Sequence, residues 1–99
     1  MPIKIERSSG NVFRDLGYSP AEAENLRLRS ELMIQLSRVI KARGLTQAGA
    51  AKLFGVTQPR ISDLVRGKIG RFSVDTLIAM LGHAGVRVSL VLRRSRKVA

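Results

Sequence analysis

The stretch TQAGAAKLFGVTQPRISDLVR, residues 46–66, decides how this chain folds. Thr46 and Thr57 stand where helices would begin, because a threonine hydroxyl accepts a hydrogen bond from the first helical turn. Gly55 suits a turn that needs a positive φ, and Ala51 is small enough to let two helices cross closely. The stretch therefore predicts a helix-turn-helix. Its inward positions are expected at Ala50, Phe54, Val56, Ile61, Leu64 and Val65.

The second helix of this unit would turn polar side chains away from the core. Gln58 lies at its start, where a recognition helix meets base edges, and can form a bidentate pair with adenine. Arg66, or Arg60, can take a guanine or a phosphate. Asp63 is acidic on a basic face, so it either accepts from a cytosine amine or orients one of those two arginines. A simple i, i+3 pair with Arg66 is a further interpretation.

The contact surface is expected to extend beyond that helix. Gln47, at the first turn of the preceding helix, can reach a phosphate with help from the helix N-terminus. Lys68 and Arg71 in the following loop would add contacts to the DNA backbone. Pro59, in contrast, supplies no polar group that could read a base. The predicted DNA-contacting residues are Gln47, Thr57, Gln58, Pro59, Arg60, Ser62, Asp63, Arg66, Lys68 and Arg71.

The charge of the chain is unevenly distributed. The formal net charge is +11 over 99 residues. Residues 1–31 carry five basic and five acidic side chains, whereas the 13 basic side chains from Leu32 onward are balanced by only Asp63 and Asp75. The positive excess lies in the part that carries the helix-turn-helix. It indicates nucleic acid as the first partner and an anionic membrane surface as the second.

Several functional classes are disfavoured by composition. The chain has no cysteine and one histidine, His83, so we expect no disulfide, no metal and no cofactor. No nucleophile with a base and no phosphate-binding loop is present, so we do not expect an enzyme. No run approaches the length of a membrane span, and the N-terminus lacks the apolar region of a signal peptide. We expect a cytoplasmic protein.

The rest of the chain divides into three parts. Residues 1–18 are expected to be an N-terminal arm. Residues 19–85 form the helical DNA-binding domain, with a first helix over residues 20–43 that could break near residues 28–30, and a last helix that starts at Ser73. Residues 86–99 comprise a strand with alternating apolar residues, followed by a basic tail. The strand must pair with residues 3–5 of the same chain or with its twin in a dimer, and Val86, Val88, Leu90 and Leu92 are the predicted dimerisation residues.

The motif resembles that of the Cro/Xre phage-repressor family. The matching residues in GLTQAGAAKLFGVTQPRISDLVRGK include the Leu45-Thr46-Gln47 triplet, Ala51, the Gly55-Val56 pair and Gln58. The resemblance implies a mainly α, lambda-repressor-like bundle of four to five helices that binds operator DNA as a homodimer. It also implies a phosphate contact for Gln47 and base-facing positions for Gln58, Pro59, Ser62 and Asp63.

The flanking segments are similar to those of small HigA-like antitoxins, which repress their own operon and neutralise an RNA-cleaving toxin. The chain is thus expected to be a transcriptional repressor that binds a palindromic operator on double-stranded DNA as a homodimer. The alternative is an antitoxin whose charge-neutral residues 1–31 bind a toxin protein. A third interpretation is RNA or membrane-surface binding through the basic tail, without sequence preference.

Overall fold

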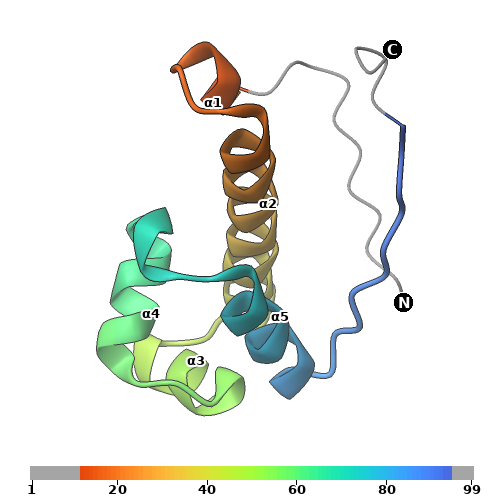
Figure 1. Cartoon of the computed structure of the whole chain (residues 1–99). Helices are drawn as coiled ribbons and strands as arrows, with labels where there is room; N and C mark the ends of the chain where they lie inside the picture. The colour runs from red at the N-terminus through yellow and green to blue at the C-terminus, as the bar shows by residue number, and fades with distance from the viewer. Residues whose placement is uncertain (1–11, 95–99) are drawn as a thin grey trace.

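The computed structural model describes residues 12–94, and every regular element in that range is helical. This confirms the mainly α prediction. The elements are α1 (Val12–Asp15), α2 (Pro20–Ala42), α3 (Gln47–Phe54), α4 (Gln58–Val65), the short 3-10 turn η1 (Ile69–Arg71) and α5 (Val74–His83). The long α2 forms the spine of the molecule, with α1 at one end and the shorter α3, α4 and α5 gathered at the other (Figure 1).

The helix α2 begins and ends where the sequence signals place it. The N–H of Glu22 donates to the Ser19 hydroxyl at 3.3 Å, and Pro20 occupies the first turn, where its missing N–H costs nothing. Gly44, with φ of 60°, follows the last turn. The break considered near residues 28–30 is absent, because α2 runs uninterrupted for 23 residues.

The core lies between the second half of α2 and the three short helices. Four large side chains are completely buried, with 0% of their surface exposed: Leu36, Phe54, Ile61 and Leu77. The other large buried side chains on α5 are Met80 and Leu81. The core-face prediction was wrong for Val65, which is 46% exposed. A helix turns about 100° per residue, so the contact through Ile61 and Leu64 leaves Val65 at the edge of the buried face.

The turn between α3 and α4 has the predicted glycine geometry. Gly55 has φ of 69°, and the N–H of Val56 donates to the carbonyl of Ala51 at 3.0 Å. Thr46 caps α3 by accepting from the N–H of Gly49, also at 3.0 Å.

Thr57 occupies the N-cap position of α4, but its side chain makes no capping hydrogen bond. The physical reason lies in Pro59 and Arg60, the residues whose N–H groups a capping side chain would normally bind. Pro59 has no N–H to donate, and the N–H of Arg60 donates to the Thr57 carbonyl instead, at 3.1 Å. The sequence therefore predicted the start of α4 correctly and the hydroxyl cap incorrectly.

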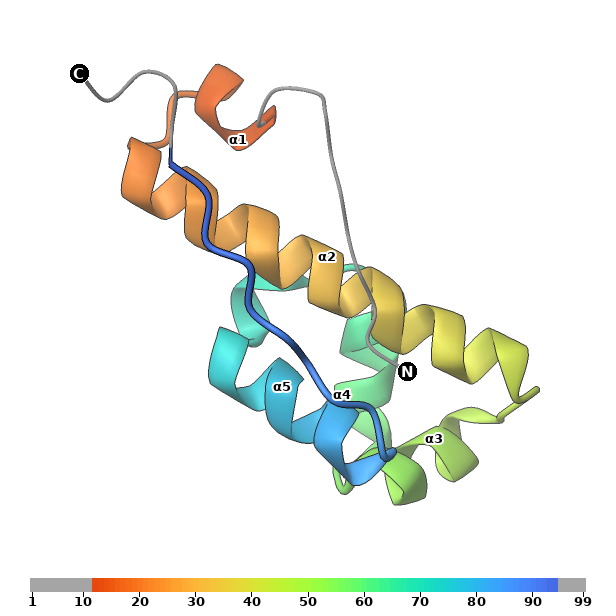
Figure 2. The same ribbon diagram turned by 90° about the vertical axis from the view of Figure 1, so that its right-hand side faces the viewer.

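The strand expected over residues 86–93 is not formed within residues 12–94. The segment leaves α5 as an extended trace without regular structure (Figure 2). Val86 and Val88 pack against the core, whereas Leu90 and Leu92 are 82% and 92% exposed. A strand exists only when a second backbone supplies its hydrogen bonds. The intrachain candidate, residues 3–5, lies outside the described residues.

Candidate nucleic-acid interface

Two glutamines stand at the starts of the two motif helices. Gln47 is the first residue of α3 and Gln58 the first residue of α4, and both are exposed. The first N–H groups of a helix have no partner inside it and carry a partial positive charge. Each glutamine amide therefore projects from a region that attracts anions.

The outer face of α4 contains both exposed and partly covered residues. Thr57, Pro59 and Arg66 are exposed, and Ser62 is half-buried. Arg66 is the C-cap of α4, and within residues 12–94 its side chain has no hydrogen bond or ion pair. Its guanidinium is thus available for a polyanion.

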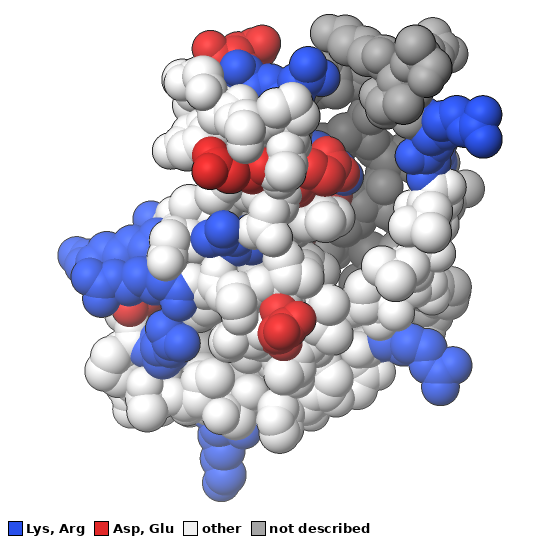
Figure 3. Space-filling view, viewed as in Figure 1, with Lys and Arg blue, Asp and Glu red and all other residues white. Residues whose placement is uncertain are grey.

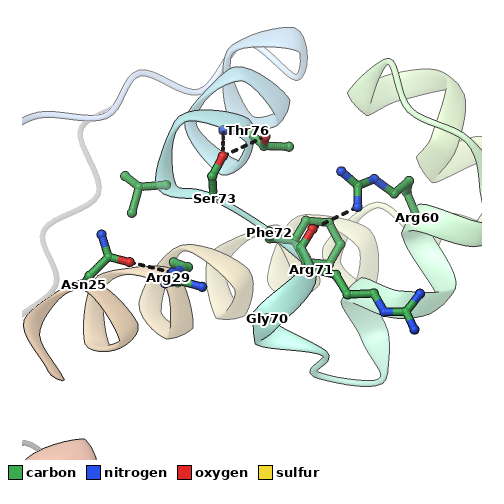
Figure 4. Close-up of a pocket in the computed structure, with 9 residues that line it drawn as sticks. Asn25, Arg29, Arg60, Gly70, Arg71, Phe72, Ser73 and Thr76 are labelled. Carbon is green, nitrogen blue, oxygen red and sulfur yellow. Dashed lines mark hydrogen bonds between the residues drawn. The ribbon is translucent and has the colours of Figure 1, made fainter. Parts of the chain in front are cut away.

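Arg60 is held by the protein itself (Figure 4). Its Nη1 donates to the carbonyl oxygen of Arg71 at 2.8 Å, and its guanidinium carbon lies 5.1 Å from the centroid of the Phe72 ring. Phe72 is buried, so the aromatic face is fixed. Arg60 therefore ties α4 to the segment after it, a role that the sequence did not indicate.

Asp63 pairs with the loop and not with its own helix. Its two carboxylate oxygens lie 3.6 Å from Lys68 Nζ and 3.5 Å from Arg71 Nη1, and its side chain is only 15% exposed. The sequence anticipated that Asp63 would orient a basic residue, but the pairs are with Lys68 and Arg71 and not with Arg60 or Arg66. Asp63 thus draws two cations of the loop toward α4.

Basic side chains gather over α4 and the turn that follows it (Figure 3). Lys68 and Arg71 are 40% and 61% exposed at the side chain even though each is paired with Asp63. The single carboxylate of Asp63 does not balance the two cations that it pairs with, so this surface remains positive. The predicted residues therefore lie on the two helices of the helix-turn-helix, α3 and α4, and on the loop that follows α4.

Arg29 on α2 binds the loop that follows α4, a contact that the sequence did not indicate. Its Nη1 donates to the Ile69 carbonyl at 3.4 Å, and its Nε donates to Asn25 Oδ1 at 2.6 Å. Arg29 also lines a cavity of about 500 Å³ whose other walls include Arg60 and Arg71. The separation of 40 residues between Arg29 and Ile69 explains why no periodic pattern could reveal the contact.

Two negative findings apply to the described part of the chain. No group of three or more His, Cys, Asp or Glu residues between residues 12 and 94 is placed to hold a metal ion. Over the same range, no helix has both the length and the apolar character needed to cross a membrane.

This architecture is similar to that of known proteins. Residues 12–93 match the family of helix-turn-helix domains. A solved structure assigned as an XRE family transcriptional regulator superimposes with a TM-score of 0.70 at 32% sequence identity, covering 79% of this chain and 88% of that one. No match was found among curated proteins. The family match spans most of the chain and the XRE family structure is 32% identical over 79% of it, so this protein belongs to the Cro/Xre-type helix-turn-helix family.

Proposed function

We propose that this protein is a transcriptional repressor that binds a specific operator on double-stranded DNA. The observation that carries the proposal is the placement of Gln47 and Gln58 at the exposed starts of two crossed helices, beside a positive loop. In this arrangement Gln58 reads a base edge and Gln47 fixes the register on a phosphate. Arg66, Lys68 and Arg71 supply sequence-independent attraction.

Selection of bound duplexes from a random DNA pool tests this proposal. A repressor enriches one motif, whereas binding through the basic tail enriches none. Gln58→Ala should then cost about 1–3 kcal/mol at one base position and little elsewhere. Gln47→Ala is the matched control, because loss of a phosphate contact weakens binding to all sequences alike. A Gln58→Ala protein that keeps the wild-type preference at every base position of the selected site would contradict the base-reading role and leave the rest of the proposal intact.

The operator is proposed to be palindromic because the protein binds it as a homodimer. Leu90 and Leu92 support this, because they are exposed apolar side chains on an extended segment that is not assigned to a strand within residues 12–94. Pairing of two such segments across a two-fold axis would bury these leucines and satisfy the backbone. Two recognition helices would then meet half-sites about 34 Å apart.

The dimer can be tested without disturbing the core. Because Val86 and Val88 pack on the core, a truncation after Ser89 retains them and removes only the exposed part. Analytical ultracentrifugation should show dimers for the full chain and monomers for the truncated chain. A truncated protein that stays dimeric would contradict the role of residues 90–93. Leu90→Glu/Leu92→Glu in the full chain separates loss of pairing from loss of the basic tail.

An antitoxin function is the second candidate, supported by the end of the molecule formed by α1 and the start of α2. Val12, Leu16 and Tyr18 are exposed there, at 58%, 69% and 47%. This end carries Asp15, Glu22 and Glu24 and lies apart from the DNA-reading helices (Figure 1). Co-expression with the protein encoded next to this gene tests the idea. A complex that is lost with Leu16→Glu and retained with Gln58→Ala would support it.

A further inference from the structure

A groove, separate from the cavity beside Arg29, lies on the face of α2 that packs beside α4. Its chemistry differs from that of the proposed DNA-reading surface. Its volume is about 530 Å³, and it is walled by α1, α2, α4 and the turn after α4. Several of the side chains that line it are apolar, including Phe13, Met33, Leu64 and Ile69. None of the residues that line it is acidic.

The part of the groove contributed by α2 is a helical stripe. Its residues are Ser30, Met33, Ile34, Ser37, Arg38 and Lys41. They recur at i, i+3, i+4, i+7, i+8 and i+11, which is one face of a helix over three turns. At 1.5 Å per residue this stripe is roughly 16 Å long. The groove is therefore elongated, which suits an extended or helical segment more than a compact small molecule.

The order of residues along the stripe sets what fits there. Ser30 and Ser37 are small and lie two turns apart, so a second helix can approach α2 closely between them. Met33 and Ile34 form an apolar contact in the middle. Arg38 and Lys41 are exposed and place two positive charges at one end. Val65, 46% exposed and apolar, borders the same space from α4.

We infer that this groove is a docking site for an acidic amphipathic helix of a partner protein. The apolar side of such a helix would cover Ile34 and Val65, in the manner of a helix laid into a groove. Its carboxylates would pair with Arg38 and Lys41, which have no acidic neighbour among the groove residues. A basic partner is disfavoured, because two like charges would then meet at this end. The site is separate from the proposed base-reading residues, none of which lines it.

The direct test is a titration of the full chain with a fluorescent helical peptide of about four turns that has leucines on one face and a glutamate pair near one end. A second peptide carries lysines in place of the glutamates. Opposite charges at a partly covered interface should make the acidic peptide bind at least about 10-fold tighter than the basic one. Amide chemical-shift changes should concentrate on residues 30–41 and 64–69.

Two double variants separate the groove from the general positive charge of the protein. Arg38→Glu/Lys41→Glu should reverse the preference between the peptides. Lys52→Glu/Arg66→Glu changes the net charge equally at exposed positions outside the groove, and should keep the preference. Val65→Asp should weaken the acidic peptide about 10-fold, which corresponds to 1.4 kcal/mol. All substituted side chains face solvent, and thermal unfolding verifies that each variant is folded.

The proposal fails if both peptides bind equally, if neither binds, or if the shift changes lie mainly on α3 and the outer face of α4. It also fails if concentration-dependent self-association of the full chain produces the same shift changes without peptide, because the occupant would then be a second copy. None of these results depends on operator binding, so loss of this proposal leaves the proposed function untouched, and the reverse holds too.

Discussion

The guanidinium of Arg60 lies over the ring of Phe72 and donates to the carbonyl of Arg71. This pairing joins α4, the second helix of the helix-turn-helix, to the loop that carries Lys68 and Arg71. A cation over an aromatic face contributes about 0.5–1 kcal/mol at a partly exposed site. The same guanidinium thus fixes the position of the loop relative to α4.

We expect Arg60→Lys to behave like Arg60→Ala and unlike the wild type. Lysine keeps the charge, but it lacks the planar fork that both stacks on Phe72 and reaches the Arg71 carbonyl. Both variants should lower the free energy of unfolding by about 1 kcal/mol and weaken binding to all DNA sequences similarly. Urea denaturation and titrations of specific and random duplexes provide the measurements.

Arg66→Lys is the matched control, because Arg66 has no side-chain partner within residues 12–94. It should leave stability unchanged. If Arg60→Lys instead retains full stability and loses affinity only at one base pair, Arg60 acts as a base reader and the loop-holding role is wrong.

Gly55 is required for two separate reasons. Its φ of 69° is unfavourable for other residues by about 1–2 kcal/mol. In addition, a Cβ at this position would lie 3.1 Å from Nε2 of His83 on α5. Gly55→Ala should therefore destabilise the protein by more than the backbone strain alone.

Gly67 allows the two effects to be separated. It has a similar φ of 73°, but a Cβ there would meet nothing within 4 Å. Gly67→Ala should cost only the strain of about 1–2 kcal/mol, and the excess cost of Gly55→Ala should disappear in a His83→Ala background. Equal unfolding free energies for Gly55→Ala and Gly67→Ala would show that the His83 ring moves aside freely.

The features that sequence predicts well in this protein are encoded locally. Ser19, Thr46 and Ser73 mark helix starts by a hydroxyl that accepts from a residue three positions on, and the structure contains all three of these bonds. Gly55 and Gly67 mark ends by a φ that other residues avoid. Such signals lie within one helical turn and need no knowledge of the tertiary fold.

The features that sequence missed depend on distant contacts or on a second molecule. The pairs of Asp63 with Lys68 and Arg71 exist only because η1 folds the loop back toward α4. The alternation in residues 86–93 predicted a strand, but within residues 12–94 the segment forms none, because an extended segment becomes a strand only with a partner backbone. The spacing of apolar residues along a sequence indicates the conformation of that segment. It gives no information about which other segment or molecule packs against it.

Glu24 should make the stability of α2 depend weakly on pH. The hydrogen bond from Arg27 holds the pKa of Glu24 below its usual value of 4.5, against a smaller opposing effect of burial. Because the folded-state pKa is lowered, the stabilisation is fully present above about pH 4.5 and is lost as the pH falls through the folded-state value. The pair is largely exposed, so its contribution should stay under about 1 kcal/mol.

Thermal unfolding of Glu24→Gln at neutral and acidic pH measures this effect. The variant should be slightly less stable than the wild type at pH 7, and the two should become equally stable once the pH has fallen below the folded-state pKa of Glu24. Glu22→Gln removes the same charge from the same end of α2 without touching the Arg27 pair, and corrects for net charge. A deficit of Glu24→Gln that persists unchanged at low pH would rule out the ion pair as its cause.

Asp63→Asn should distinguish between base reading and loop positioning by this carboxylate. If Asp63 only holds Lys68 and Arg71, its neutralisation releases two cations toward the phosphates. Non-specific affinity should then rise, and the slope of log K against log salt should steepen by about one unit or less, because one negative charge has left the interface. Preference at each base pair of the selected site should stay the same.

If Asp63 instead accepts from a cytosine amine, Asp63→Asn should relax discrimination at one G·C position by about 1–3 kcal/mol. Titrations of single-base variants of the selected site at three salt concentrations separate the two outcomes. Ser62→Ala, on the adjacent half-buried position of α4, is the control for loss of a polar group without change of charge. The ion-pair distances of 3.5 and 3.6 Å and the 15% exposure of Asp63 favour loop positioning, because a side chain committed to two cations is poorly placed to reach a base.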